Sequence, residues 1–227
     1  MVIKRPISLK KQAYDAIRTA ILQRELSHDL IYSEKWFADC YQISRTPVRE
    51  ALLQLRDEGL IEVLPNRGVI IKPLTVEDAA NIYHMRAAIE GYCSAYLAEH
   101  ATEESGVETL KRVEELLEKC RENFNYADEM QFHLEIIQYT KNVEFINQYN
   151  RMRAKIDIFW NEVAAKEGRP HEIYGEHKAI LDAMKAGNAE EARKASERHL
   201  MIIHEKLQQG DLLTPFGELK SVDAGRM

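Results

Sequence analysis

The chain has 227 residues, of which 45% are hydrophobic and 30% are charged, and its formal net charge at pH 7 is −6. This length is ordinary for a soluble protein of two domains, and the three widely separated cysteines argue against a disulfide framework. No apolar run approaches the roughly 18 residues that a membrane-spanning helix needs, and no signal peptide is recognisable, so we expect a cytoplasmic protein without a membrane partner.

The first third of the chain contains three predicted helices. Residues 8–25 place alanine and isoleucine at helical spacing, and residues 33–40 form a second, shorter segment. The third helix is expected over residues 44–60, after a connection of only three residues, 41–43. Such a short turn is what a helix-turn-helix needs for its last two helices to cross steeply.

The third helix has start and stop signals. We expect Ser44 or Thr46 to accept a hydrogen bond from a free backbone amide at its start. Pro47 suits the first turn and Glu50 complements the helix dipole, while Gly59 ends the helix.

One face of this helix is apolar, and its first turn is polar. The apolar residues recur at three- and four-residue intervals, so we expect them to be buried. They are Val48, Ala51, Leu52 and Leu55. Arg45, Thr46 and Arg49 are then exposed at the N-terminal end, where such side chains can reach bases in a DNA groove.

Two short β-rich runs follow, residues 60–64 and 69–72, and they flank a loop that contains Pro65 and Gly68. This pattern predicts a hairpin. Three helices and a two-stranded wing make a winged helix-turn-helix. Arg67 lies at the wing tip, where it could reach a phosphate or the minor groove.

The distribution of charge agrees with a DNA-binding first domain. Residues 1–73 hold 12 Lys and Arg against 9 Asp and Glu, whereas the remainder holds 19 against 28. A basic first third joined to an acidic remainder suits a DNA-binding module beside a domain with another task. The alternative is a small helical subdomain whose arginines only keep its surface hydrated.

The run from Ser33 through Arg45-Thr46-Pro47-Val48-Arg49-Glu50-Ala51-Leu52 to Arg67-Gly68 resembles the DNA-binding domain of the GntR family of bacterial transcription regulators. The resemblance implies contacts with double-stranded DNA from the second helix, the third helix and the wing tip. The DNA-binding residues are then Lys35, Ser44, Arg45, Thr46, Arg49, Arg67 and Gly68. The sequence departs from the family pattern at Trp36-Phe37, which changes the packing around the second helix.

Beyond Pro73 the chain has no further proline until Pro170, which indicates long helices. We predict that residues 74–211 form an all-α domain of six helices with short connections, packed as an antiparallel bundle. The helices are expected over residues 76–100, 104–123, 126–140, 143–166, 171–186 and 189–209. We expect residues 212–227 to form a flexible tail.

Three histidines and a carboxylate in this domain are candidate metal ligands. Glu129 and His133 are four residues apart and share a helix face, while His177 and His199 lie on the last two helices. One imidazole from each of three helices and a carboxylate could bind a divalent ion such as zinc, nickel or manganese. The alternative is that these histidines are ordinary surface or core residues.

A second resemblance covers the helical domain. Phe132-His133, Glu176-His177 and His199 are similar to the FCD ligand-binding domain of the FadR subfamily within the GntR regulators. In many members of that subfamily, an aspartate four residues before the first histidine completes a three-histidine metal site.

Glu129 occupies the position of that aspartate here, and its side chain, which is longer by one methylene, can still bind a metal through its carboxylate. Asp128 lies one residue earlier and is rotated by about 100° on the helix, so it is the poorer candidate.

The resemblance also implies an effector site. Arg86 matches an arginine that in relatives lines the pocket and can pair with a ligand carboxylate. The alternative for Arg86 is an intrahelical pair with Glu90. Asn142 is expected to cap a helix first and to lie near the effector second. His171 and His204 do not match the motif, and we expect both to face solvent.

The sequence therefore favours a ligand-responsive transcription regulator, not an enzyme, that binds a two-fold symmetric operator as a homodimer. A small organic acid would bind in the helical domain with the metal as an anchor, and residues 72–75 would form the pivot. One alternative is a metal-dependent hydrolase, for which we find neither a placed general base nor a His-Glu-x-x-His run. Another is a constitutive DNA-binding protein with a purely structural metal.

Overall fold

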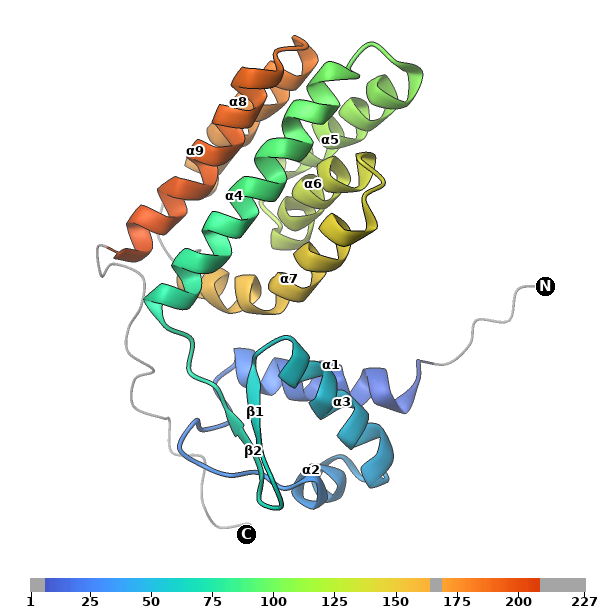
Figure 1. Ribbon diagram of the computed structural model, residues 1–227, viewed down its shortest axis with the longest axis vertical. Helices are drawn as coiled ribbons and strands as arrows, with labels where there is room; N and C mark the ends of the chain where they lie inside the picture. Colours follow the sequence, from blue (N-terminus) through green and yellow to red (C-terminus); the bar gives the residue numbers. More distant parts are fainter. Residues whose placement is uncertain (1–6, 164–168, 209–227) are drawn as a thin grey trace, which may run out of the picture. The chain divides into compact units, whose positions relative to one another are not determined.

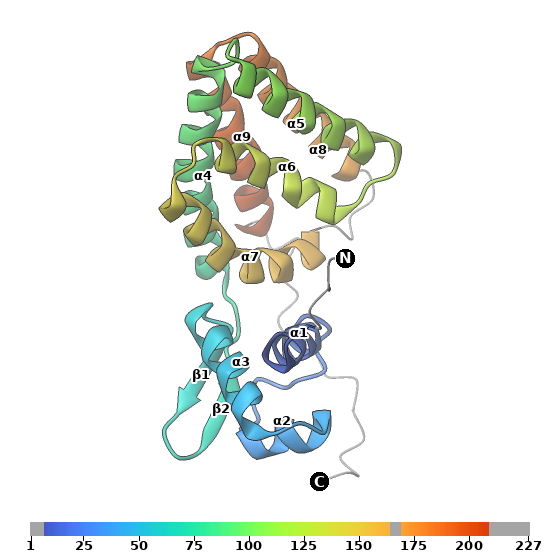
Figure 2. The ribbon, with the colours of Figure 1, turned by 90° about the vertical axis from the view of Figure 1, so that its right-hand side faces the viewer.

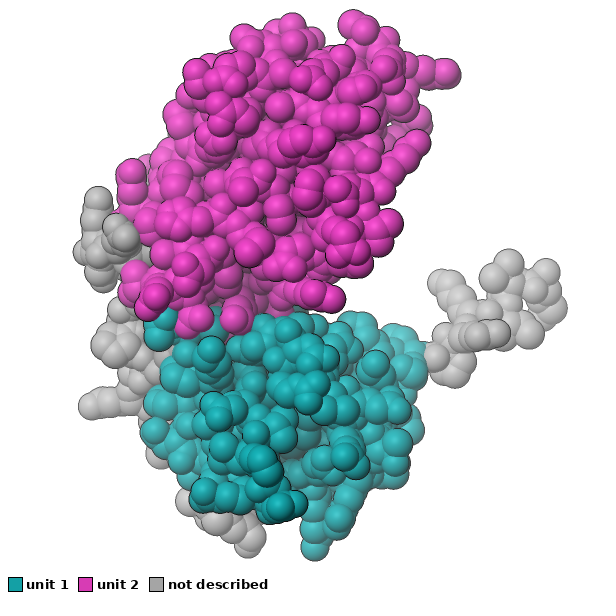
Figure 3. Space-filling model, viewed as in Figure 1, with its two compact units in different colours: residues 1–75, 214–227 teal, residues 76–213 magenta. Residues whose placement is uncertain are grey.

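The computed structural model of the protein describes residues 7–163 and 169–208, which fall into two compact units that divide between Thr75 and Val76 (Figures 1 and 3). The described part of the chain is mostly helical, and its two strands form one hairpin. None of the described helices combines the length and the apolar character needed to cross a bilayer. The tail predicted over residues 212–227 lies outside the described residues.

The first unit contains three helices and a two-stranded wing, as the sequence predicts. The helices are α1 (Leu9–Leu22), α2 (Glu34–Tyr41) and α3 (Arg45–Asp57), and the strands are β1 (Ile61–Leu64) and β2 (Gly68–Ile71). Residues 42–44 connect α2 to α3, one residue later than predicted, and Gln42 turns the connection with a φ of 54°. This arrangement is a winged helix-turn-helix.

A serine precedes each helix of this unit, and two of the three serines cap their helix through the side chain. The side-chain oxygens of Ser8 and Ser33 accept hydrogen bonds from the backbone amides of Lys11 and Trp36, at 3.2 and 3.0 Å. Ser44 is the N-cap of α3 by position, yet its side chain makes no capping hydrogen bond. Of the two residues predicted to cap α3, Ser44 or Thr46, Ser44 therefore forms no capping bond, and it is exposed at the start of α3.

The core of the first unit forms where α3 packs against α1 and α2. The predicted apolar stripe of α3 is buried throughout, and Ile17 of α1 and Phe37 of α2 are also inaccessible to solvent. The helix ends where predicted, because Gly59 adopts a φ of 72° and its amide donates to the carbonyl of Arg56. This packing leaves the first turn of α3 facing outward.

The wing is an antiparallel pair in which Ile61 lies opposite Ile71 and Leu64 lies opposite Gly68. It is also attached to the segment before α2. The backbone groups of Tyr32 and Val69 exchange two hydrogen bonds of 2.8 Å. The wing is therefore not an isolated hairpin, because Tyr32 forms a short third β-pairing with its strand β2.

The described residues of the second unit form a bundle of six helices, as predicted, and the most extensive contact in it is between α4 and α9. Figures 1 and 2 show these two helices side by side, with α8 next to α9 and α5 next to α6. The helices are α4 (Val76–Glu99), α5 (Glu104–Glu122), α6 (Tyr126–Tyr139), α7 (Val143–Val163), α8 (Arg169–Lys185) and α9 (Ala189–Gln208).

Asparagine and glycine residues separate several of these helices. The side chain of Asn125 caps α6 by accepting from the amide of Ala127 at 2.8 Å. Gly187, with a φ of 68°, and Asn188 separate α8 from α9. The break predicted between residues 166 and 171 includes residues 167 and 168, which lie outside the described residues. Short connections of this kind bring α6, α8 and α9 around the same core.

Candidate metal centre and nucleic-acid interface

A groove of about 460 Å³ lies in the first unit between the wing and the first turns of α2 and α3. It gathers five of the seven residues predicted to contact DNA, from three separate elements. They are Lys35, Arg45, Arg49, Arg67 and Gly68. The other two predicted residues, Ser44 and Thr46, are exposed at the start of α3 beside this groove.

The groove holds four positive side chains and one opposing carboxylate. Glu34 Oε1 lies 3.7 Å from Arg49 Nε, and both side chains are largely exposed, at 42% and 70%. An exposed pair at that separation contributes little stability, so Arg49 is available to exchange Glu34 for another partner. A positively charged helix N-terminus beside a wing is typical of a surface that binds DNA.

Gly68 has a structural role in this interface. Its φ is 130°, and a Cβ placed there would lie 2.3 Å from the carbonyl oxygen of Tyr32. A residue with a side chain would therefore push the wing away from the segment before α2. The structure therefore shows a steric requirement for glycine at position 68 that the sequence alone did not reveal.

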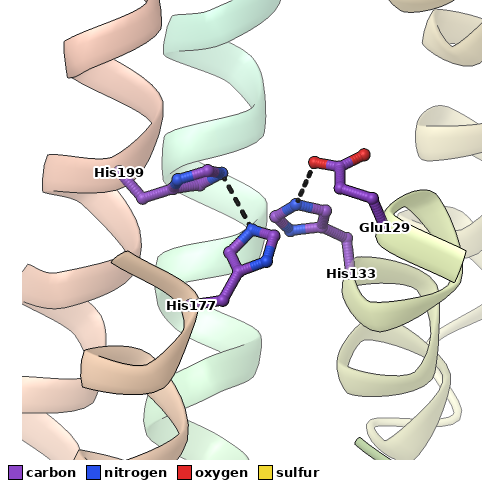
Figure 4. A group of neighbouring side chains, drawn as sticks. All are labelled: Glu129, His133, His177 and His199. Atoms are coloured by element: carbon purple, nitrogen blue, oxygen red, sulfur yellow. Dashed lines mark hydrogen bonds and ion pairs between the residues drawn. The ribbon is translucent and has the colours of Figure 1, made fainter. Parts of the chain in front are cut away.

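In the second unit, the four predicted metal ligands meet in the core of the bundle (Figure 4). Glu129 and His133 come from α6, His177 from α8 and His199 from α9. Their side chains are buried, with 1–3% exposure, and the ligand atoms all lie within 4.8 Å of one another. Asp128 is not part of this group.

Two further carboxylates orient the histidines from outside the cluster. Glu90 Oε2 of α4 lies 2.7 Å from Nδ1 of His133, and Glu176 Oε2 of α8 lies 2.6 Å from Nδ1 of His199. Each carboxylate accepts the Nδ1 proton, so the Nε2 lone pair of each ring points inward. Carboxylates that fix the ring and its tautomer in this way are a regular companion of metal-bound histidine.

No pattern in the sequence assigns Glu90 and Glu176 to the site. The sequence predicts Glu90 only as an intrahelical partner of Arg86, and Glu176 only as part of the motif that contains His177. The signal that could have found Glu176 is its place directly before a histidine of the motif. Glu90 lies more than one helix away from His133, so no local spacing connects the two residues.

Burial and charge oppose each other in this network. Burial would raise the pKa of Glu90, but Arg86 and His133 outweigh it and lower the pKa to about 2. Burial would lower the pKa of His133, but Glu90 and Glu129 raise it above its ordinary value. For His199 burial is the largest influence, and its pKa falls. The carboxylates therefore favour a positive charge at this place, carried either by a protonated His133 or by a cation bound to a neutral His133.

The inward-facing atoms form a donor set that fits a divalent cation. With Nδ1 bonded to Glu90, a neutral His133 presents its Nε2 lone pair to Glu129 Oε1 at 3.2 Å. The Nε2 atoms of His177 and His199 also face each other at 3.2 Å. Glu129 Oε2 is buried with no hydrogen-bond partner among the described residues. Three imidazole nitrogens and a carboxylate oxygen turned toward one another suit zinc, nickel or manganese.

Arg86 is connected to the same network. Its Nε donates to Glu90 Oε1 at 2.6 Å, so the predicted intrahelical pair is present. Its Nη2 is buried and has no partner among the described residues. The rings of Tyr83 and Tyr149 flank the guanidinium at 5.6 and 5.9 Å. The pair with Glu90 thus leaves Arg86 one donor for another acceptor.

The cluster is approached from one side by a groove between α8 and α9 of about 360 Å³, whose lining includes Glu176 and His199. Asn142, the second predicted effector residue, is exposed. Its Oδ1 caps α7 by accepting from the amides of Glu144 and Phe145 at 3.0 and 3.3 Å. The capping role predicted for Asn142 is therefore present, and its contact with an effector stays a prediction.

The two histidines outside the motif differ from each other. His171 is exposed, as predicted. The prediction that His204 faces solvent is wrong, because its ring packs 4.9 Å from that of His84 on α4 and its Nε2 is buried. The position of His204 on α9 could not indicate its burial, because the contact is made by a residue of another helix, α4.

Two family models match the chain, one in each of its two units. Residues 9–71 match the family model described as bacterial regulatory proteins, gntR family, and residues 81–201 match that of the FCD domain. The HTH-type transcriptional repressor RspR of Escherichia coli (strain K12) is 25% identical over 198 residues, which cover 83% of this chain and 86% of RspR.

Two further comparisons concern a part of the chain and its fold. An HTH-type transcriptional regulator in the TAR-I ttuE-ttuC' intergenic region of Agrobacterium vitis is 38% identical over 86 residues, 38% of this chain and 50% of that protein. The solved structure of a GntR transcriptional regulator from Rhodococcus sp. RHA1 has a TM-score of 0.68 at 22% identity and covers 89% of this chain and 99% of its own. That structure has the same fold.

These matches join the basic groove of the first unit to a known DNA-binding domain, and the helical bundle to a known effector-binding domain. The proteins of the family are transcription regulators and not enzymes, which removes the hydrolase alternative. The chain belongs to the GntR family of bacterial transcription regulators and carries a C-terminal FCD domain.

Proposed function

We propose that this regulator is a cytoplasmic homodimer of the FadR subfamily that senses a small organic acid through a divalent metal ion in its helical domain. The observation that carries the proposal is the buried group of Glu129, His133, His177 and His199. Arg86 is linked to this group through Glu90. A cation site and an anion-binding guanidinium therefore share one network.

The residues of this network suit a carboxylic acid. A metal ion held there would act as a Lewis acid toward an oxygen of the effector. Arg86 Nη2 is free to donate a charge-assisted hydrogen bond to a carboxylate, which is stronger than a bond between neutral groups. Because Glu90 contacts both Arg86 and His133, an anion at Arg86 changes the charge balance at a candidate metal ligand.

At the DNA, the first turn of α3 would enter the major groove. Arg45 and Arg49 would read base edges, and each good bidentate contact contributes about 1–3 kcal/mol of base discrimination. Ser44, Thr46 and Lys35 would contact the phosphate backbone, and Arg67 would reach a phosphate or the minor groove. The common groove that Lys35, Arg45, Arg49 and Arg67 line supports this assignment.

The exposed face of α4 supports a homodimer. Met85 and Tyr92 are 44% and 53% exposed, and with Ala88 they recur at helical spacing along that face. Tyr92 also contacts Phe145 of α7, at 5.5 Å between ring centroids. An apolar stripe of this kind suits a two-fold contact with a second copy, which would place two winged helix-turn-helix domains on a palindromic operator.

We place the domain boundary at Pro73, with the DNA-binding domain over residues 1–73, the effector domain over 74–211 and the pivot over 72–75. The effector would act by binding the DNA-competent and the incompetent arrangements with different affinities. A typical coupling free energy for such a change is about 1–3 kcal/mol.

The test is a mobility shift on the DNA upstream of the regulated gene, with candidate acids added to metal-loaded protein. We expect one acid to change operator affinity in the wild type, because it binds through the metal and Arg86. Arg86→Lys keeps the positive charge opposite Glu90 but loses the Nη2 donor, so it should retain DNA binding and respond only at higher acid concentrations.

Two outcomes would contradict the proposal. Operator binding that is unaffected by any acid and by removal of metal would identify a constitutive DNA-binding protein. Sedimentation of the operator complex as a single chain on each site would exclude the homodimer.

A further inference from the structure

The seam between α4 and α9 contains a second pair of histidines, His84 and His204, outside the cluster described above. Their ring centroids lie 4.9 Å apart, with the planes tilted by 58°. His84 is exposed and His204 is half-buried. Nε2 of His204 is buried and has no hydrogen-bond partner among the described residues.

The packing of the two helices explains why the histidines meet. A Cβ added to Gly91 of α4 would lie only 3.3 Å from side-chain atoms of Arg193 and Glu197 of α9, so glycine leaves room for the two helices to pack closely there. Seven residues before Gly91 on α4 is His84, and seven residues after Glu197 on α9 is His204. Seven residues are close to two helical turns, so antiparallel helices in this register place the two histidines opposite each other.

The pair has the chemistry of a metal site. Imidazole nitrogens are preferred ligands of zinc, nickel and copper. Here two of them come from different rigid helices, so their separation is set by helix packing and not by loop geometry. Leaving a buried ring nitrogen without a partner is unfavourable, and a bound cation would satisfy it.

We propose that His84 and His204 form a second metal site, for a borderline divalent ion such as zinc. Two protein ligands hold a metal ion more weakly than three histidines and a carboxylate do. The exposed position of His84 leaves the remaining coordination positions to water. This site would fill only at a higher metal concentration than the buried cluster. A bound ion would link α4 to α9 in the N-terminal half of α4, which follows residues 72–75.

Zinc stoichiometry of the full-length protein tests the proposal. Equilibrium dialysis against zinc chloride, followed by elemental analysis, should give two ions per chain, one tight and one weak. His84→Ala and His204→Ala should each lose the weak ion and keep the tight one. His171→Ala is the matched control, because it removes an exposed histidine of the same unit and should keep both ions.

A second measurement separates this site from the buried cluster. In a His177→Ala background, zinc should shift the side-chain nitrogen NMR signals of His84 and His204 together, whether or not the buried cluster binds metal. Unshifted signals would overturn the proposal, as would loss of the weak ion in His171→Ala to the same extent as in His204→Ala. Retention of both ions in His84→Ala and His204→Ala would overturn it as well.

Discussion

Glu176 lies behind a candidate metal ligand and accepts a short hydrogen bond from it. Its Oε2 accepts from Nδ1 of His199 at 2.6 Å, and its side chain is 15% exposed. We expect Glu176→Ala to lower metal affinity by about 10- to 100-fold, because the ring loses the group that fixes its tautomer and orientation. Competition with a coloured chelator measures this. The control is Glu172→Ala, an exposed carboxylate one turn earlier on α8, and an equal loss in both variants would refute the role of Glu176.

Arg49 is the residue on which sequence-specific DNA binding should depend most. Its side chain is 70% exposed and pairs with Glu34 only at 3.7 Å. Arg49→Ala should weaken operator binding by about 1–3 kcal/mol relative to unrelated DNA. The melting temperature should stay unchanged, since an exposed pair adds little stability.

Arg56→Ala is the control for Arg49→Ala. Arg56 is also exposed and paired, with Asp57 at 2.7 Å, but it lies at the opposite end of α3. It should keep operator binding in the same mobility-shift titration. If Arg49→Ala binds the operator as the wild type does, the assignment of α3 as the recognition helix is wrong.

At the scale of the element, the wing depends on Gly68. The residue combines a φ of 130° with a carbonyl oxygen of Tyr32 that a Cβ would approach to 2.3 Å. Gly68→Ala should cost about 1–3 kcal/mol from backbone strain alone, and the clash adds to this cost. We expect a lower melting temperature together with weaker DNA binding, because the wing loses its attachment to Tyr32.

The control for the wing is another glycine-to-alanine change. A Cβ at Gly175 in α8 meets no atom within 4 Å, and alanine is favoured over glycine in a helix. Gly175→Ala should leave the melting temperature unchanged or raise it. An unaltered melting temperature in Gly68→Ala would show that the backbone there relaxes without cost.

At the scale of the whole molecule, a metal ion in the buried cluster would link α6, α8 and α9. A ligand that binds only the folded state stabilises it by RT ln(1 + [L]/Kd), which is about 4 kcal/mol at 1,000 times Kd. Chelation should therefore lower the melting temperature measured by calorimetry, and added metal should restore it. His177→Ala should respond little to either treatment. Protein that carries no stoichiometric metal and ignores added metal would refute the buried site.

Much of the fold could be predicted because its signals are local. The apolar stripe of α3, the glycine that ends it and the asparagines that cap α6 and α7 all act within one or two helical turns. The same holds for the exposure of Arg45 and Arg49, which follows from the opposite face being buried. The absence of a capping bond at Ser44 could not be predicted, because side-chain orientation at a helix start depends on its surroundings.

Local patterns in the sequence are enough to predict the winged helix-turn-helix, the helical bundle and the residues proposed to bind DNA and metal. The packed structure was needed to show that Glu90 and Glu176 orient His133 and His199, and that His204 packs against His84. Helical periodicity determines which residues share a face, whereas the register between two packed helices depends on side chains far apart in the chain.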